Sequence, residues 1–136
     1  MNFVRFLIFV TVLLFANASK AYNIAVVAPK VEKMARFGNE LIDGAQIAVD
    51  MINEQGGLLG DKLNLVTIDD RCEDAFAVST AQMIALNSSK EDKIDLVIGP
   101  FCDNMFEEIA DIYEQNKIIR IIPMPLNEKQ NSMNFK

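Results

Sequence analysis

Short apolar runs alternate with longer amphipathic segments along most of this 136-residue chain, and this alternation limits what it can fold into. Residues 22–28 (YNIAVVA) form a continuous apolar run, typical of a strand buried on both faces of a parallel sheet. Residues 94–98 (IDLVI) and 118–122 (IIRII) predict two further strands. Residues 62–69 (KLNLVTID) alternate with a period of two, which favours a strand nearer the sheet edge.

The segments between these strands predict helices over residues 38–55, 74–87 and 104–115, and residues 29–37 are expected to form a loop. In the first helix, one apolar stripe contains Leu41, Ala45, Ala48 and Ile52. Two glycines end that helix, because glycine accepts the left-handed backbone of a helix C-terminus. Single helices between strands require a parallel sheet with right-handed crossovers. We therefore expect an α/β fold with a parallel sheet of about four strands and alternating helices.

The N-terminus has the three parts of a secretory signal peptide. Arg5 supplies a positive charge, residues 6–16 form a short apolar core, and small residues follow. Cleavage after Ala18 and cleavage after Ala21 both fit this pattern. A membrane anchor is the alternative, but a spanning helix needs about 20 apolar residues. We predict a signal peptide at residues 1–21, a periplasmic or secreted product, and no stable membrane insertion after cleavage.

The remainder divides into a lobe at residues 22–126 and a polar tail at 127–136, which is expected to be disordered. Removing Arg5 and Lys20 with the signal leaves 11 of the 13 bases against 19 acids. This acidity argues against a nucleic-acid partner. The chain has no histidine and no recognisable pairing of a nucleophile with a base, so we expect neither an enzyme nor a cofactor.

Ligands of open parallel sheets bind beyond the carboxyl ends of the strands, and four segments of this chain are expected there. They are residues 29–37, 69–73, 100–104 and 123–127. Cys72 follows the second strand and Cys102 the third, which in the common doubly wound order flank the first strand. A disulfide between them needs Cα atoms within about 7 Å. Two free thiols are the alternative.

Several other side chains at this edge allow two interpretations. Asp69 and Asp70 suit a cation or ammonium site, or alternatively a turn and helix cap, which is the interpretation we favour. Asp103 stands where an N-cap of the third helix is expected. Phe37 lies near the start of the first helix, where its ring either faces a ligand or packs against the protein.

Seven stretches in order and spacing resemble the leucine/branched-chain amino-acid binding proteins, the type I periplasmic binding proteins of ABC transporters. The resemblance covers nearly all of residues 22–125 and only the N-terminal part of such a protein. Its most specific parts are the block GAQIAVDMIN and the two cysteine motifs. The stretches are residues 24–27, 35–38, 44–53, 56–63, 69–73, 97–102 and 111–114.

This resemblance implies a disulfide between Cys72 and Cys102 and a ligand cleft at the carboxyl edge of the sheet. It also implies an aromatic contact to the ligand's side chain at Phe37, with an amino acid or similar small solute as ligand and an ABC permease as partner. The family holds the amino acid with a serine after the second cysteine and a threonine after the fourth strand. Asp103 and Leu126 stand at those positions here.

Three functions compete on this evidence. The first is a truncated periplasmic solute-binding protein related to branched-chain amino-acid import, because the resemblance covers only an incomplete first lobe of the two-lobed family fold. The second is a non-functional remnant of a split or decayed reading frame. The third is a small exported domain that binds a protein partner through the part of its sheet that later elements would cover.

Overall fold

A computed structural model describes residues 21–102 and 106–123 of the chain. The predicted signal peptide (apart from Ala21), Asp103, Leu126 and the polar tail therefore lie outside the described residues. None of the helices within the described ranges is long and apolar enough to cross a membrane.

The chain forms a four-stranded parallel sheet in the order β2-β1-β3-β4. The strands are β1 (Ala21–Val27), β2 (Lys62–Ile68), β3 (Ile94–Ile98) and β4 (Ile119–Ile121). In register, Ile24 of β1 lies between Leu65 of β2 and Leu96 of β3. The α/β class, the four strands and the edge position of β2 were all predicted, and the structure confirms them.

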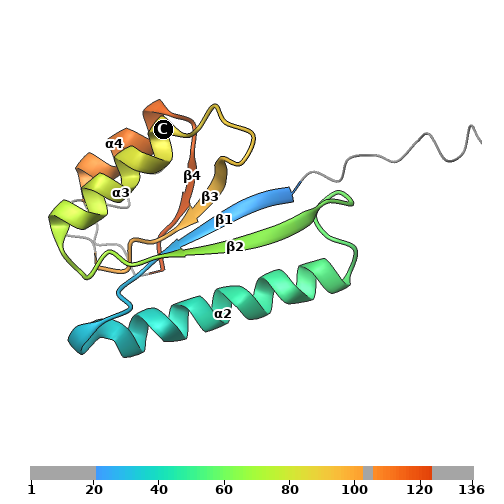
Figure 1. Cartoon of the computed structure of the whole chain (residues 1–136), viewed down its shortest axis with the longest axis horizontal. Helices are drawn as coiled ribbons and strands as arrows, with labels where there is room; N and C mark the ends of the chain where they lie inside the picture. The colour runs from blue at the N-terminus through green and yellow to red at the C-terminus, as the bar shows by residue number, and fades with distance from the viewer. Residues whose placement is uncertain (1–20, 103–105, 124–136) are drawn as a thin grey trace, which may run out of the picture.

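Helices cover both faces of this sheet (Figure 1). A short 3-10 helix, η1 (Glu32–Met34), leads into α2 (Ala35–Glu54), which packs on β1 and β2 from one side. On the other side lie α3 (Asp74–Leu86) and α4 (Phe106–Gln115), which pack against each other. Because a parallel sheet is covered on two faces, the buried part of an inner strand must be apolar. Residues 24–28 are accordingly all buried.

The core is divided between the two faces of the sheet. On the α3 and α4 side, Ala25, Val27 and Val97 pack against Ile109 and Tyr113, all at most 2% exposed. On the α2 side, the smaller clusters gather around Ile24 and Val26, which alternate with the first set along β1. This alternation means that one strand supplies the centre of both halves of the core.

Helix α2 begins earlier than the apolar stripe predicts. We expected a loop to residue 37 and a helix from residue 38, but η1 and α2 already occupy residues 32–37. The N-cap, Met34, makes no side-chain capping hydrogen bond, so the usual sequence signal for a helix start is missing. The first turn of α2 packs closely on the preceding loop, because Gly38 approaches the carbonyl group of Pro29 so closely that a Cβ atom would overlap it.

Candidate functional site at the carboxyl edge of the sheet

The loops that follow the strands are held together by backbone hydrogen bonds. Ala28 N donates to Ile68 O at the end of β2 (3.0 Å), and Phe101 N donates to Val27 O at the end of β1 (3.2 Å). Gly99 N donates to Ile121 O at the end of β4 (2.9 Å). These bonds extend the sheet's pairing beyond the strand ends, so the loops form a continuous platform at the edge where ligands of parallel sheets bind.

A disulfide between Cys72 and Cys102 joins the loops after β2 and β3 across the end of β1. The two Cα atoms are 5.0 Å apart, within the range that a disulfide requires. This is the pairing that the family resemblance implied, and free cysteines are absent from the described residues. The bridge fixes the loop after β2 relative to the loop after β3.

Asp69 links the loop after β1 with the loop after β2. Its Oδ1 accepts hydrogen bonds from the backbone N–H groups of Lys30 (2.9 Å) and Arg71 (3.0 Å). The Lys30 ammonium also donates to the Thr67 hydroxyl at 3.0 Å, so it lies over the end of β2. Asp69 thus behaves as the turn residue that we favoured. The helix-cap part of that interpretation is wrong. The N-cap residue of α3 is Glu73, and its side chain makes no capping hydrogen bond.

Asp70 lies beneath the same turn, with its residue fully buried. Its Oδ1 accepts the backbone N–H of Cys72 (3.1 Å), whereas its Oδ2 has no hydrogen-bond partner among the described residues. Burial raises the pKa of this carboxyl above its ordinary value of 3.8, the Cys72 N–H opposes the rise, and the Asp69 charge adds to it. The bond to Cys72 supports a turn in which Arg71 and Cys72 both have a left-handed φ of 54°.

Phe37 of α2 stacks on Phe101, which follows β3 directly before the disulfide. The ring centroids are 6.1 Å apart and the ring planes are inclined by 12°. Phe101 also packs on the core beneath α2, while Phe37 remains 47% exposed. One side of the Phe37 ring therefore packs on the protein and much of its surface is open at the carboxyl edge, while a contact of this ring with a ligand stays a prediction.

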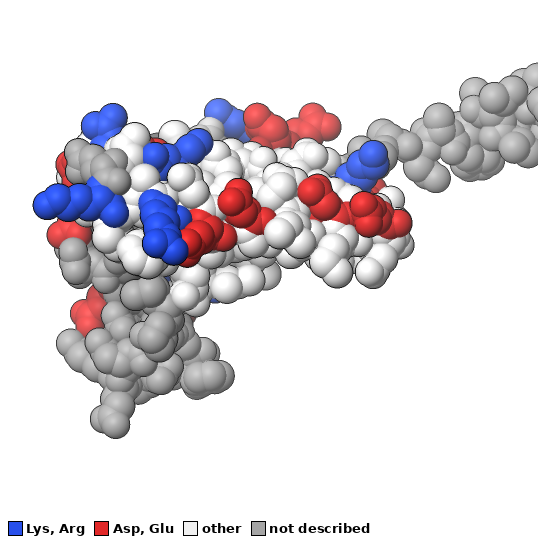
Figure 2. Space-filling view, turned by 90° about the horizontal axis from the view of Figure 1, so that it is seen from below, with Lys and Arg blue, Asp and Glu red and all other residues white. Residues whose placement is uncertain are grey.

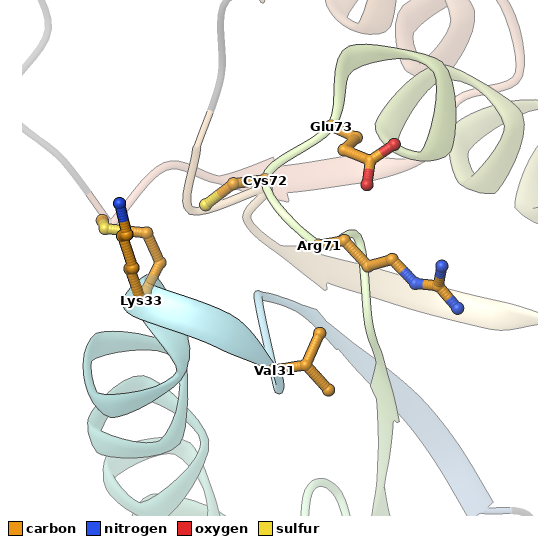
Figure 3. A pocket seen from close by; sticks show the side chains of 6 residues that line it. Val31, Lys33, Arg71, Cys72 and Glu73 are labelled. Carbon is orange, nitrogen blue, oxygen red and sulfur yellow. The ribbon is translucent and has the colours of Figure 1, made fainter.

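A pocket of about 810 Å³ lies beside the disulfide, between η1 with its preceding loop and the loop after β2 (Figure 3). Its lining has two cationic side chains, one carboxylate, two apolar side chains and a disulfide sulfur. These belong to Lys33, Arg71, Glu73, Val31, Met34 and Cys72. The Arg71 guanidinium lies 4.6 Å from the centre of the Phe76 ring, which holds its charge on the α3 side of the pocket.

The predicted site residues are thus brought together only in part. Phe37 and the two cysteines lie at one edge, as expected, while Asp103 and Leu126 fall outside the described residues. Sequence reasoning missed Phe101 and the charged lining of the pocket. Phe101 had one available signal, since it lies between a predicted strand and a cysteine. No group of three or more potential metal ligands occurs in the parts of the chain that the structure describes.

Residues 21–135 match a family model described as periplasmic binding protein. The Leu/Ile/Val-binding protein of Escherichia coli strain K12 is 36% identical over 113 residues, which cover 82% of this chain. That alignment spans only 29% of the Escherichia coli protein, so the chain corresponds to less than a third of the curated relatives it matches.

Solved structures agree with this comparison. An ABC transporter substrate-binding protein from Desulfitobacterium hafniense, in complex with Leu, is 29% identical with a TM-score of 0.65. The match covers 84% of this chain and 32% of that one. A branched-chain amino acid substrate-binding protein from Streptococcus pneumoniae, in complex with isoleucine, has a TM-score of 0.71. This match also covers 84% of this chain and 32% of that one, and its sequence identity of 24% supports the fold alone.

Proposed function

Because this chain belongs to the periplasmic binding protein family, we propose that it forms part of a solute-binding protein for branched-chain amino-acid import. Its relatives are binding proteins for Leu, Ile and Val, and it is related to the binding proteins of ABC importers. In this proposal residues 1–21 direct export, the product acts in the periplasm or is secreted, and an ABC permease receives the solute.

The observation that carries the proposal is the half-exposed ring of Phe37 at the carboxyl edge. Phe101 stacks behind it, so the ring is held in place and presents an apolar surface toward the open side of the edge. An aliphatic side chain is the group that such a surface receives best, because its burial needs no hydrogen-bond partner. The fixed loops at this edge support a preformed wall for a ligand.

The polar half of the proposed site differs from the family. Asp103 places a carboxylate where the family places a serine donor, so it repels the ligand's carboxylate. Leu126 replaces the threonine, and a leucine leaves a polar ligand group without its hydrogen bond. We therefore expect this chain to bind leucine weakly. A remnant without binding remains the competing hypothesis, and a partner-binding domain is the third.

Calorimetric titration of the folded chain with leucine, isoleucine and valine tests the proposal, with arginine as the mismatched ligand. Phe37→Ala should weaken binding by about 5–30-fold, because it removes roughly 1–2 kcal/mol of apolar contact. The double variant Asp103→Ser/Leu126→Thr restores the family's donors and should tighten binding by about tenfold or more.

Leu86→Ala serves as the control, since Leu86 is exposed at the end of α3, away from the carboxyl edge. Its affinity should equal that of the unmodified chain. If both the natural chain and the double variant unfold cooperatively but neither shows heat of binding with any branched-chain amino acid, the proposal fails. That result supports the remnant hypothesis instead.

A further inference from the structure

The turn that carries Cys72 has an unfavourable backbone. Arg71 and Cys72 both have a φ of 54°, in the left-handed region that is costly for residues with a Cβ atom. Three links hold this turn: Asp69 Oδ1 accepts the Arg71 N–H (3.0 Å), Asp70 Oδ1 accepts the Cys72 N–H (3.1 Å), and the disulfide joins Cys72 to Cys102. Breaking the covalent link lets the turn relax, which favours exchange of this disulfide over that of one in relaxed loops.

The disulfide can be reached through the pocket of about 810 Å³. Both cysteines are half-buried, but only Cys72 is among the described residues that line this pocket. In Figure 3 the Cys72 side chain points toward η1, on the side of the pocket where Lys33 lies. The rate of thiol–disulfide exchange depends on access to the attacked sulfur. A small thiol that enters the pocket therefore meets Cys72 before Cys102.

The charge on the Cys72 side of the pocket is positive. Lys33 is exposed and forms no ion pair with a described side chain. Glu73 is the one carboxylate among the described lining residues, and Figure 3 shows it pointing away from η1, as Arg71 does. Figure 2 shows Lys and Arg side chains gathered at the end of the molecule where η1 lies. Because the attacking species is a thiolate, Lys33 attracts the reactive form.

We propose that the disulfide is an exchange site for small anionic thiols, in which Cys72 Sγ is the attacked sulfur and Lys33 attracts the thiol. The incoming thiolate forms a bond with Cys72 Sγ while the bond between Cys72 and Cys102 breaks. The electron pair of that bond leaves on Cys102 Sγ, which takes a proton from water. The product carries the small thiol on Cys72 and a free thiol on Cys102, with no net oxidation or reduction.

Exchange at Cys72 changes how the carboxyl edge is held together. Cys102 directly follows Phe101, whose ring stacks on Phe37. Once the bridge is open, the loop after β3 is no longer covalently tied to the loop after β2. Phe101 then keeps its packing and its backbone hydrogen bond to Val27 (3.2 Å). The support behind the Phe37 ring therefore comes to depend on the thiols present around the protein.

Peptide mass spectrometry tests the proposal on the full chain under native conditions. The oxidised chain is incubated with excess glutathione, an anionic thiol, and samples are quenched with acid. Free thiols are then labelled with N-ethylmaleimide, and trypsin separates the two cysteines because Lys90 and Lys93 lie between them. At early times we expect glutathione on Cys72 and maleimide on Cys102.

A pair of matched variants tests the role of the charge. Lys33→Met removes the ammonium but keeps the length of the side chain, and should slow formation of the glutathione adduct by about threefold to fivefold. It should not slow the reaction with cysteamine, a thiol that carries a positive charge. Lys90→Met removes the same charge from an exposed position before β3, at the opposite edge of the sheet, and should leave both rates unchanged.

A third variant separates exchange in the folded chain from exchange after unfolding. Ile84→Val leaves a cavity in the core at the far end of α3, so it lowers stability without touching the pocket. It should react at the natural rate, and faster exchange would overturn the proposal.

The proposal is also overturned if the disulfide stays intact, if glutathione is found on Cys102, or if both thiols appear without an adduct on Cys72. Equal rates of Lys33→Met and Lys90→Met with glutathione would overturn it as well. The reaction requires no solute, so it and the titration with branched-chain amino acids can fail independently.

Discussion

Asp70 is a carboxylic acid that the fold has removed from water without giving it a cation. One oxygen accepts a single backbone N–H, and the other has no partner in the described parts of the chain. Such burial disfavours the charged form, which is why the pKa of Asp70 lies above 3.8 in the folded state. The contribution of Asp70 to the free energy of unfolding is therefore most favourable below pH 3.8 and falls as the pH rises toward the folded-state pKa.

Asp70→Asn should remove this loss of unfolding free energy at rising pH, because an amide has no charge to bury. The difference in unfolding free energy between the variant and the natural chain should grow in the variant's favour as the pH rises above 3.8, and then level off. Urea unfolding at a series of pH values measures it. Asp111→Asn, at an exposed site on α4, is the matched control and should show no such growth. A difference independent of pH would contradict the burial argument.

The sequence could not separate Asp70 from Asp69, because both are the same residue type at the same strand end. Their different roles depend on which one is buried beneath the turn, and in the folded chain that residue is Asp70. The stack of Phe37 on Phe101 is similar, since its two rings are 64 positions apart along the chain. By contrast, the family resemblance implied the cysteine pairing, and the positions of the cysteines after two predicted strands made it possible.

At the scale of elements, the first turn of α2 packs closely on the loop after β1. Gly38 packs against the Pro29 carbonyl, whereas Gly44, two turns later, faces open space. Gly38→Ala should therefore lower the free energy of unfolding by about 1–3 kcal/mol through overpacking. Gly44→Ala should raise it by about 0.5–1 kcal/mol, because alanine is the better helix former. Thermal unfolding of both variants measures the contrast, and equal shifts in one direction would refute it.

The body of α2 was predictable, because its stripe of Leu41, Ala45 and Ile52 follows the helical period. Its first turn was not, since residues 32–37 are mixed in charge and lack a side-chain cap. The strands were located to within one or two residues, because continuous apolar runs are needed wherever both faces of a sheet are covered.

For the whole molecule, the disulfide is the one covalent link between distant parts of the sheet. Cys72 and Cys102 are 30 residues apart, and their bridge restricts the unfolded chain. Cys72→Ser/Cys102→Ser should lower the free energy of unfolding by about 3–4 kcal/mol in the chain-entropy model. That is a large part of the roughly 5–15 kcal/mol that holds a typical domain together.

Denaturant titration of the double serine variant measures this loss. The natural chain reduced with dithiothreitol should unfold at nearly the same urea concentration, because it lacks the same link. An unchanged midpoint in both samples would mean that the bridge adds nothing to the stability of the sheet.

The position of β1 has a consequence for how the chain is made. It is the central strand, yet it is the first of the four to leave the ribosome, and its partners around Leu65 and Leu96 come much later. No stable sheet forms until those residues have been synthesised, because parallel pairing depends on contacts distant in sequence. During that interval a largely apolar strand is exposed on the nascent chain, where a holding chaperone or the export machinery can engage it before folding begins.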